Sequence, residues 1–463
     1  MRTRRSAAAL VLGVVVLAAC GLADGTDRSG SRPLIVDLDM DSSDVMALAY
    51  ATQLPGYQLV AVTVPATGVA RCPLAAGNAT RLLAELGKSA TPVACGTETA
   101  MGSGHAFPDA WRNPADAMYG VRLEAAAAEG SSDAVSLLRE TLRTVDEPVD
   151  LLTLGPLTNV ASALRAEPQL AERIARVVMM AGAFAAPGNV DTPSIGSAEW
   201  NAWADPEALA AVLGSDVDVV MVPLDATDDV PVDRGFYGDL SGNHAAAAAD
   251  VTYELLTRNA FLLDAQQYFW DPLAATFLEE PGVLDLQPMQ VRIGTDPGRE
   301  LGRTIAGGAG RPVQVARAAI RETFAETFLA GLRRGNDRAQ AFTPGGPLTV
   351  RYDGTTCALD GATDLSAGPV RLSFSTNEDR QSALALVTLH ADATWDQLQA
   401  YVTAYRAGSP NPDFVDLQVP MLPAPGVEVI ADLPAGVSGV ACFDHANGIT
   451  QRVVLSDSFE VAP

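Results

Sequence analysis

Acidic and hydroxyl side chains gather directly behind the first apolar run after the N-terminal region, Leu34–Val36. An apolar run that ends in aspartates predicts a buried strand with carboxylates at its carboxyl end, and open α/β sheets bind their ligands at that edge. Several oxygen donors so close together favour a hard cation, and Ca²⁺ is the ion we expect. The group consists of Asp37, Asp39, Asp41, Ser42, Ser43 and Asp44.

The same group also has a purely structural interpretation. Aspartate and serine side chains accept hydrogen bonds from the free N–H groups in the first turn of a helix, so Ser43 or Asp44 would be the N-cap of a following helix. These residues alone favour neither interpretation. The motifs farther along the chain decide between them.

Further polar motifs follow in order along the chain, most of them behind strand-like runs. Together with Asp37-Leu38-Asp39, the ordered set resembles the inosine–uridine-type nucleoside hydrolases, which cleave the N-glycosidic bond of ribonucleosides. The resemblance covers about Pro33 to Asn336 and depends on the whole set, because no single motif is decisive. The further motifs are Gly155–Asn159, Ala198–Asn201 with Asp205–Ala208, Leu224–Thr227 and Trp270–Pro272.

The chemistry of that family explains the need for carboxylates. Cleavage of a ribosyl–base bond builds positive charge on the sugar. A bound Ca²⁺ can hold the ribose hydroxyls and the attacking water and lower the pKa of that water, while a carboxylate removes its proton as general base. By resemblance, Asp39 contacts the metal and acts as the base. The resemblance also implies three further metal ligands, which are the carboxylates of Asp44 and Asp271 and the backbone carbonyl of Leu154.

Three polar residues match the positions that hydrogen-bond the ribose in this family, namely Asn189, Glu199 and Asn201. Each of them alone has an ordinary interpretation, because Asn after Gly forms turns, a lone Glu is solvated, and Asn caps helices. Their combination with the other motifs favours substrate binding.

Ser43 departs from the family pattern, which has two consecutive aspartates at the positions of Ser43 and Asp44. The first of these aspartates normally accepts a hydrogen bond from a ribose hydroxyl. A serine hydroxyl can also bond there, but charge-assisted hydrogen bonds are roughly twice as strong as neutral ones. Asp41, two residues earlier, is a candidate to compensate. The departure bears on catalytic rate and substrate identity rather than on the fold.

Two tryptophans bear on how the base is held. Trp270 precedes Asp271, where many family members carry a His that could protonate the departing base. The purine-preferring branch instead places the base between aromatic rings, and Trp111 is the second ring expected here. Stacking contributes roughly 1–3 kcal/mol per base, so we expect purine nucleosides. Ordinary packing of both tryptophans is the alternative, and His105 is a further candidate near the leaving group.

Two other functions fit parts of the sequence. Because of Ser43, a surface protein that binds a nucleoside or related riboside without turnover is the main alternative. Asp37-Leu38-Asp39 also resembles the strand-end motif of aspartate-nucleophile phosphatases. Those enzymes need a positioned cation for phosphate, and Lys88, the only lysine of the chain, is poorly placed for that role.

Residues 1–20 resemble a lipoprotein signal peptide. A basic start with three arginines precedes the apolar run Ala7–Ala18, and Leu17-Ala18-Ala19-Cys20 resembles the lipobox in which Cys20 becomes lipidated. Acyl chains contribute roughly 0.8 kcal/mol per buried methylene, so Cys20 and a linker over residues 21–32 predict an extracytoplasmic, membrane-anchored protein. An ordinary cleaved signal peptide is the alternative.

Charge and cysteine content agree with an exported protein. The formal net charge is −25, and such a surface repels phosphate backbones, which excludes nucleic acid as a partner. Exported thiols generally pair. Apart from Cys20 there are four cysteines with three possible connectivities, and proximity in sequence favours Cys72–Cys95 and Cys357–Cys442. The oligomeric state stays open, a homo-oligomer included.

Strand-like and helix-like stretches alternate from Leu34 to about Asn336, which predicts a doubly wound, mainly parallel sheet over residues 33–342. The strand-like runs are Leu34–Val36, Leu59–Val64, Thr91–Ala94, Val149–Leu154, Val177–Ala181 and Val217–Leu224. The helix-like stretches are Gly77–Leu86, Ala134–Arg143, Leu157–Arg165, Glu207–Leu213, Ala245–Ala260 and Gln314–Arg334.

After Gly345-Gly346-Pro347, short strand-like runs at regular spacing predict an all-β Greek-key sandwich, cupredoxin-like, over residues 347–463. Cys442 and His445 are residue types of a blue-copper site, but no methionine follows them, so a structural disulfide is the better interpretation. The strand-like runs are Leu348–Arg351, Val370–Phe374, Ala383–Leu389, Phe414–Leu417, Val427–Ala431, Val440–Phe443 and Arg452–Leu455.

Overall fold

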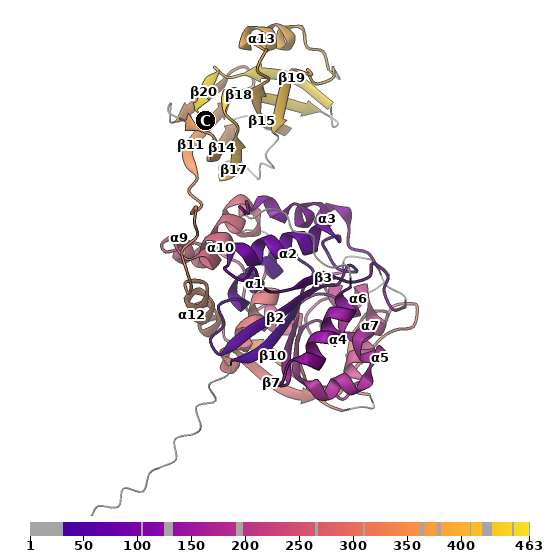
Figure 1. The fold of residues 1–463 in the computed structure, drawn as a ribbon. Helices are drawn as coiled ribbons and strands as arrows, with labels where there is room; N and C mark the ends of the chain where they lie inside the picture. Colours follow the sequence, from indigo (N-terminus) through magenta and orange to yellow (C-terminus); the bar gives the residue numbers. More distant parts are fainter. Residues whose placement is uncertain are drawn as a thin grey trace, which may run out of the picture.

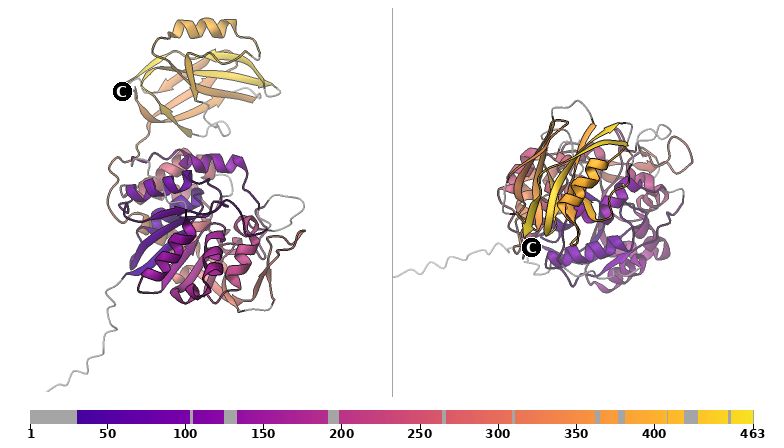
Figure 2. Two further views of the ribbon diagram at one scale, coloured as in Figure 1. Left: turned by 45° about the vertical axis from the view of Figure 1, so that its right-hand side comes forward. Right: turned by 90° about the horizontal axis from the view of Figure 1, so that it is seen from above.

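The chain forms an α/β part and a strand-rich C-terminal part, which lie one above the other in Figures 1 and 2. The computed structural model describes residues 31–462 except 103–104, 125–132, 191–197, 264–266, 309–310, 362–364, 377–380, 408, 419–427 and 447–448. The expected signal peptide, Cys20 and most of the expected linker lie outside the described residues.

The α/β part is built on one sheet with the strand order β3-β2-β1-β4-β5-β6-β10-β7. Neighbouring strands are parallel except for β10 and β7, which confirms the predicted mainly parallel sheet. Chain order reverses between β1 and β4, and ligands bind in the crevice at such a switch point. The strands are β1 (Arg32–Asp37), β2 (Tyr57–Val64), β3 (Val93–Cys95), β4 (Val149–Thr153), β5 (Ile174–Met180), β6 (Val219–Val222), β7 (Leu284–Met289) and β10 (Val313–Ala319).

Helices cover both faces of this sheet (Figure 1). In β1, Leu34 and Val36 pack into one core with α1, α2, α10, α11 and α12, whereas Ile35 packs into the other core with α4, α5 and α7. The helices are α1 (Ser42–Ala51), α2 (Leu74–Glu85), α3 (Asp109–Asp116), α4 (Ala134–Thr144), α5 (Thr158–Ala166), α6 (Trp200–Ala204), α7 (Pro206–Leu213), α8 (Leu224–Thr227), α9 (Arg234–Ser241), α10 (Ala247–Arg258), α11 (Trp270–Phe277) and α12 (Arg321–Leu332), with the 3₁₀ turns η1 (Met118–Gly120), η2 (Pro168–Arg173), η3 (Ala260–Leu263) and η4 (Pro281–Val283).

The prediction of one helix from Gln314 to Arg334 is wrong in its first part. Val313–Ala319 is the strand β10, and only Arg321–Leu332 is helical. The segment pairs with β6 on one side and with β7 on the other. Val315 packs on one face of the sheet and Ala316 on the opposite face, so tertiary pairing overrides the helical preference of an alanine-rich sequence.

The C-terminal part contains two β-sheets that enclose a shared apolar core. One sheet has the order β12-β11-β14-β17, and the other has the order β13-β20-β18-β15-β16 with β19 paired to β18. A helix, α13 (Trp395–Ala404), packs beside β19. The strands are β11 (Gly345–Tyr352), β12 (Cys357–Gly361), β13 (Leu365–Ser366), β14 (Gly368–Thr376), β15 (Gln381–Leu389), β16 (Val415–Gln418), β17 (Glu428–Leu433), β18 (Gly436–Ala446), β19 (Ile449–Leu455) and β20 (Phe459–Ala462).

Both predicted disulfides are present. Cys72 is bonded to Cys95, which ties the segment before α2 to the end of β3. Cys357 is bonded to Cys442 across the core between the two C-terminal sheets. Cys442 is therefore occupied by a disulfide, while the side chain of His445 lies outside the described residues.

The two parts meet through Asp432 of β17. Its carboxylate accepts charged hydrogen bonds from Arg258 at 3.1 and 3.2 Å and forms an ion pair with Arg122 at 2.8 Å. Arg258 is itself held by Glu254 at 2.7 Å. Within the described ranges, no helix has both the length and the apolar character needed to cross a membrane.

Candidate active site

The acidic loop lies at the switch point, between the end of β1 and the start of α1. Met40 has a φ of 62°, and this left-handed turn leads the chain from the strand into the helix. Asp41 is the N-cap, because its Oδ1 accepts the N–H groups of Ser43 at 2.5 Å and Asp44 at 2.9 Å. In return, Asp44 Oδ2 accepts the N–H of Asp41 at 3.1 Å, and it also accepts the N–H of Asp39 at 3.0 Å. The prediction that this group caps the helix is therefore right, but the N-cap is Asp41 rather than Ser43 or Asp44.

Asp41, Asp44 and Asp271 form a compact acidic group. One carboxylate oxygen of each lies within 4.8 Å of the others, and Asp271 reaches the group from the first turn of α11. Ser43 connects them, since its hydroxyl lies 2.8 Å from Asp41 Oδ1 and also contacts Asp271 Oδ2. Asp39 lies beside this group and lines the same cavity.

A divalent cation fits the acidic group. Asp44 Oδ1 and Asp271 Oδ1 are buried and have no hydrogen-bond partner among the described residues. Burial, followed by the neighbouring carboxylates, raises the pKa of both groups well above the usual range. Converging carboxylates repel one another and lose hydration in the protein interior, and a hard cation relieves both costs. The expected ligand carboxylates Asp44 and Asp271 are thus brought together, with Asp41 as an addition.

Asp39 is packed tightly between two glycines. A Cβ atom on Gly68 would lie 2.1 Å from the Asp39 Cβ, and one on Gly155 would lie 2.9 Å from it. Asp39 Oδ2 accepts the N–H of Val69 at 3.0 Å, which fixes the carboxylate. Burial raises the pKa of Asp39 to about 7, and a base with a pKa near neutrality is suited to proton abstraction at that pH.

Asp37 lies under the site rather than in it. Its Oδ1 accepts hydrogen bonds from Thr63 at 2.5 Å and Asn159 at 2.9 Å, so it joins β1 to β2 and α5. Burial raises the pKa of Asp37 to about 7. Of the two aspartates at the end of β1, the structure therefore places Asp39 toward the cavity and Asp37 toward the packed interior.

The predicted ribose-binding residues form one connected wall. Glu199 caps α6 and accepts the N–H of Asn201 at 2.8 Å and of Gly182 at 2.9 Å. Asn201 Nδ2 donates to the carbonyls of Leu154 at 2.8 Å and Met180 at 3.1 Å. A carbonyl oxygen has two lone pairs, so this bond leaves Leu154 able to accept a second partner.

Aromatic rings form a further part of the cavity lining, and Trp200 is the ring that the sequence interpretation missed. Phe107 stacks on Trp200 with centroids 4.7 Å apart, and Trp111 meets Trp200 edge-on at 5.1 Å. Asn189 Oδ1 accepts the Trp200 N–H at 3.0 Å and so holds its backbone in place. The presence of Trp200 inside the motif Ala198–Asn201 was the available signal.

His105 lies elsewhere. Its ring stacks on Trp203 with centroids 3.9 Å apart, and it is absent from the described residues that line the cavity. The structure therefore gives His105 no place near a leaving group. Burial lowers its pKa, so less of the imidazole is protonated at neutral pH.

These walls enclose a cavity of about 500 Å³. That volume lies in the range of small-molecule sites. Asp44, fully buried, lies behind the lining residues. The sequence-predicted residues that line the cavity are Asp39, Ser43, Trp111, Leu154, Asn189, Glu199, Asn201, Trp270 and Asp271.

A comparison with protein families agrees with this geometry. Residues 34–326 match the model of the inosine-uridine preferring nucleoside hydrolases. The chain belongs to this family. Membership confirms the predicted enzyme class, a hydrolase that acts on N-glycosyl bonds, and the family is metal-dependent.

Individual relatives support the assignment. The pyrimidine-specific ribonucleoside hydrolase RihA of Shewanella sp. (strain ANA-3) is 32% identical over 286 residues, which is 59% of this chain and 86% of the relative. The inosine-uridine preferring nucleoside hydrolase of Bacillus anthracis superposes with a TM-score of 0.57 at 26% identity, covering 65% of this chain and 99% of that one. A purine-preferring ribonucleoside hydrolase from Gardnerella vaginalis shares the fold, with a TM-score of 0.53 at 24% identity, over 65% of this chain and 98% of that one.

Proposed function

We propose that this hydrolase cleaves the N-glycosidic bond of ribonucleosides with the aid of a bound divalent cation, for which Ca²⁺ is the expected ion. The observation that carries the proposal is the position of Asp39. Its fixed carboxylate lines a nucleoside-sized cavity beside the buried acidic group Asp41, Asp44 and Asp271. Two buried carboxylate oxygens of that group have no hydrogen-bond partner among the described residues, which favours a bound cation. Because the donors are oxygen atoms, a hard cation is expected.

Each side chain has a distinct task in this proposal. Asp39 accepts the proton of the attacking water, while Glu199 and Asn201 orient the ribose hydroxyls. Asp39, Asp44, Asp271 and the Leu154 carbonyl would hold the cation. Asp41 is a further carboxylate beside them. When bound, the cation supplies Lewis-acid chemistry that lowers the pKa of a water and fixes its direction.

Asp41 compensates for Ser43 in this proposal. The Ser43 hydroxyl is buried and contacts Asp41 Oδ1 and Asp271 Oδ2, so it serves as a connection inside the acidic group. Asp41 is partly exposed and lines the cavity. The carboxylate that the family carries at position 43 is therefore replaced by a carboxylate two residues earlier.

Purine nucleosides are the substrates we favour. Trp111 and Trp270 both line the cavity, and Trp111 is 45% exposed, which leaves its ring free to cover a base. Base–aromatic stacking contributes roughly 1–3 kcal/mol. The name of the Shewanella relative specifies pyrimidines, and that of the Gardnerella fold neighbour specifies purines, so the assay has to include both classes.

Product analysis on a nucleoside panel tests this function. Inosine, adenosine, guanosine, uridine and cytidine are incubated with the protein, with and without a chelator, and free base is measured. We expect base release that is fastest for purines, is lost with the chelator and is restored by Ca²⁺. Asp39→Asn should reduce kcat by about 10²–10⁴-fold while the protein stays folded. Absence of base release from every nucleoside in the presence of Ca²⁺ would refute the proposal.

A nucleoside receptor without turnover is the second candidate, and the buried Ser43 hydroxyl is the observation that favours it. Calorimetric binding with the ligand recovered intact would support the receptor. In that case Ser43→Asp should restore base release, since it returns a carboxylate to the position that the family uses.

We also propose that the protein is a lipoprotein on the outer face of a membrane, anchored through Cys20. The support is the basic and apolar start of the sequence with its lipobox-like end. Detergent phase partitioning of the expressed protein should place it in the detergent phase, and Cys20→Ala should move it to the aqueous phase. For the C-terminal part we propose a cupredoxin-like Greek-key sandwich, which an experimental structure would test.

A further inference from the structure

A second cavity, of about 710 Å³, lies where the C-terminal part meets the α/β part. Among the described residues, it shares no lining side chain with the active-site cavity. The turn η3 separates the two, because Phe261 and Leu262 line the active-site cavity whereas Ala260 and Leu263 line the second one. We call this second cavity the junction cleft.

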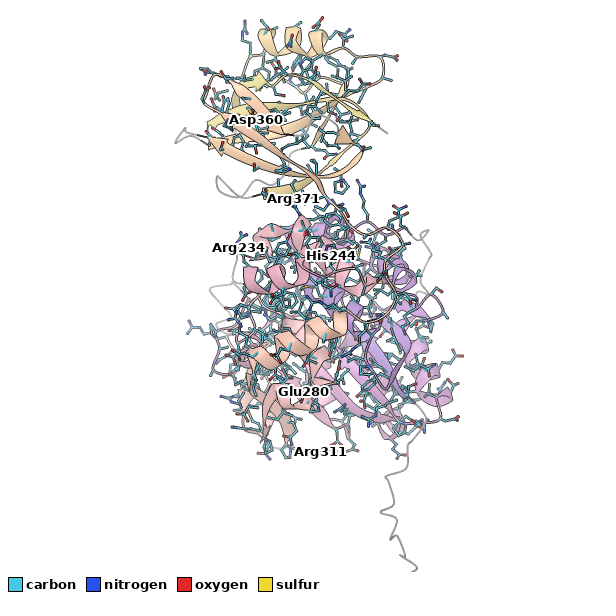
Figure 3. All side chains as sticks on the ribbon, turned by 90° about the vertical axis from the view of Figure 1, so that its left-hand side faces the viewer. Arg234, His244, Glu280, Arg311, Asp360 and Arg371 are labelled. Carbon is cyan, nitrogen blue, oxygen red and sulfur yellow. A yellow bond between two sulfur atoms is a disulfide. The ribbon has the colours of Figure 1, made fainter. Side chains whose placement is uncertain are left out.

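Arg371 is the residue of the junction cleft that could bind an anion (Figure 3). It extends from β14, and within the described part of the chain it has no ion-pair partner. Its guanidinium donates to the Tyr253 hydroxyl at 3.3 Å. The nearby Arg258 is neutralised, because it binds Glu254 and Asp432. A guanidinium without a carboxylate partner can bind an anion through its planar set of N–H donors.

Hydroxyl groups surround this guanidinium. Tyr237 and Tyr253 stack with centroids 5.6 Å apart, and the Tyr237 hydroxyl lies 3.0 Å from Thr257 Oγ1. The Thr257 hydroxyl donates to the Tyr253 carbonyl at 2.6 Å, so the Tyr237 hydroxyl donates to Thr257 Oγ1. The Tyr253 hydroxyl is therefore the member of the stacked pair that lies beside the guanidinium with a proton to donate. Three serines also line the cleft. Ser241 donates to the Gly238 carbonyl at 2.8 Å and Ser373 to Thr349 Oγ1 at 3.1 Å, so Ser375 adds the further hydroxyl donor.

The anion that matches this lining is a phosphate monoester. Its three terminal oxygens accept from a guanidinium and from the Tyr253 and Ser375 hydroxyls at once, which a planar carboxylate does less well. Glu428 is the one carboxylate among the described lining residues and is exposed. It can accept from hydroxyl groups on the rest of the ligand, which favours a phosphorylated sugar over a bare phosphate.

We propose that the junction cleft is a binding site for a phosphate monoester with a hydroxyl-bearing body, held by Arg371 and the Tyr253 hydroxyl. The site is independent of nucleoside hydrolysis, because its lining side chains are separate from the active-site cavity.

Calorimetry on the full chain tests the proposal, with ribose 5-phosphate, inorganic phosphate and uncharged ribose as probes. A chelator is present throughout, so that no cation at the acidic group can attract phosphate. We expect ribose 5-phosphate to bind and inorganic phosphate to bind more weakly. Because ribose carries no phosphate, we expect it not to bind to the junction cleft. Arg371→Gln should weaken ribose 5-phosphate binding by about ten-fold or more, because hydrogen bonds to charged groups are strong.

Arg351→Gln is the matched control, since Arg351 lies on the neighbouring strand β11 and pairs with Asp360 on the surface. It should bind the probes as the unmodified protein does. Tyr253→Phe keeps the stacked ring and removes one hydroxyl donor, so it should weaken ribose 5-phosphate binding by a few-fold. If Arg371→Gln fails to fold, Tyr253→Phe is the variant that tests the proposal. Absence of binding by both phosphate probes, or unchanged affinity in Arg371→Gln and Tyr253→Phe, would overturn the proposal.

Discussion

Burial has a larger effect than any neighbouring charge on the proton affinity of four aspartates at and beneath the active-site cavity. It is the largest cause of the raised pKa of Asp37 and Asp39, and also of Asp44 and Asp271. A desolvated carboxylate binds its proton more tightly because the charged form loses hydration. The same physics acts on Asp228, which lies outside the proposed active site and can be studied without a cation.

Asp228 gives a prediction about pH. Burial, followed by the charges of Asp225 and Asp229, raises its pKa from 3.8 to about 6. The folded chain therefore holds this proton more tightly than the unfolded chain does, so the stability contributed by Asp228 is present below about pH 4 and is lost as the pH rises to about 6. Asp228→Asn removes this titration.

We therefore expect the urea midpoint of Asp228→Asn, relative to that of the unmodified protein, to increase between pH 4 and pH 7. Urea unfolding at several pH values, followed by circular dichroism, measures the difference. The exposed Asp146→Asn is the control and should produce no such trend. A difference that stays constant with pH would contradict the prediction.

Among the elements, the loops at the carboxyl ends of β1, β2 and β4 determine where the proposed base lies. Asp39 follows β1, Gly68 follows β2, and Gly155 follows β4. The three meet at the switch point of the sheet, and the absence of side chains on both glycines is what makes room for the aspartate. Asp39 is thus positioned by three loops rather than by its own loop alone.

Gly68→Ala tests this arrangement. The added methyl group would lie 2.1 Å from the Asp39 Cβ, so loop and base must move apart. Overpacking of this kind costs about 1–3 kcal/mol, and we expect a lower Tm together with slower base release. Gly238→Ala is the control, because Gly238 lies in α9 with nothing within 4 Å of an added Cβ, and its stability should be unchanged or slightly higher. Equal effects of the two substitutions would argue against the arrangement.

Continuous β-branched runs made much of the sheet predictable. The expected runs Leu34–Val36, Leu59–Val64 and Val149–Leu154 coincide closely with β1, β2 and β4. β10 was misread because its alanine-rich sequence has helical preference and its partners are far away in the chain. The helix α13 was missed although Thr394 and Gln397 form a capping box that the sequence displays.

The site was predictable where motifs lie next to strand ends and less so where distant side chains pack together. The family resemblance named the acids and amides that line the cavity. The Trp200 wall depends on Phe107, which lies on a loop far away in sequence. The connection from Ser43 to Asp271 likewise depends on how α1 and α11 pack. Neither contact can be read from local sequence patterns.

Across the whole molecule, Asp432 connects the C-terminal part to the segments that border the active-site cavity. Its partner Arg122 lies just after η1, which contributes Tyr119 to the cavity, and its partner Arg258 lies just before η3, which contributes Phe261. The C-terminal part therefore braces two segments of the cavity rim through one carboxylate.

Asp432→Asn should weaken the contact between the C-terminal part and the α/β part, because it removes the charge that pairs with Arg122 and Arg258. The carboxylate is partly exposed, so we expect a loss of roughly 1 kcal/mol in the coupling between the two parts. Differential scanning calorimetry should then resolve two unfolding transitions that lie farther apart than in the unmodified protein. Asp360→Asn is the control, because Asp360 pairs with Arg351 inside the C-terminal part. A larger separation in the control would contradict the prediction.

The two disulfides each close a loop inside one part, and none of the four bonded cysteines bridges the junction. A single peptide cut between α12 and β11 would consequently yield two fragments that migrate apart on a non-reducing gel under denaturing conditions. Each fragment would keep its own crosslink. For the anchoring through Cys20 proposed above, protease treatment of membranes should release the distal fragment and leave the α/β fragment bound.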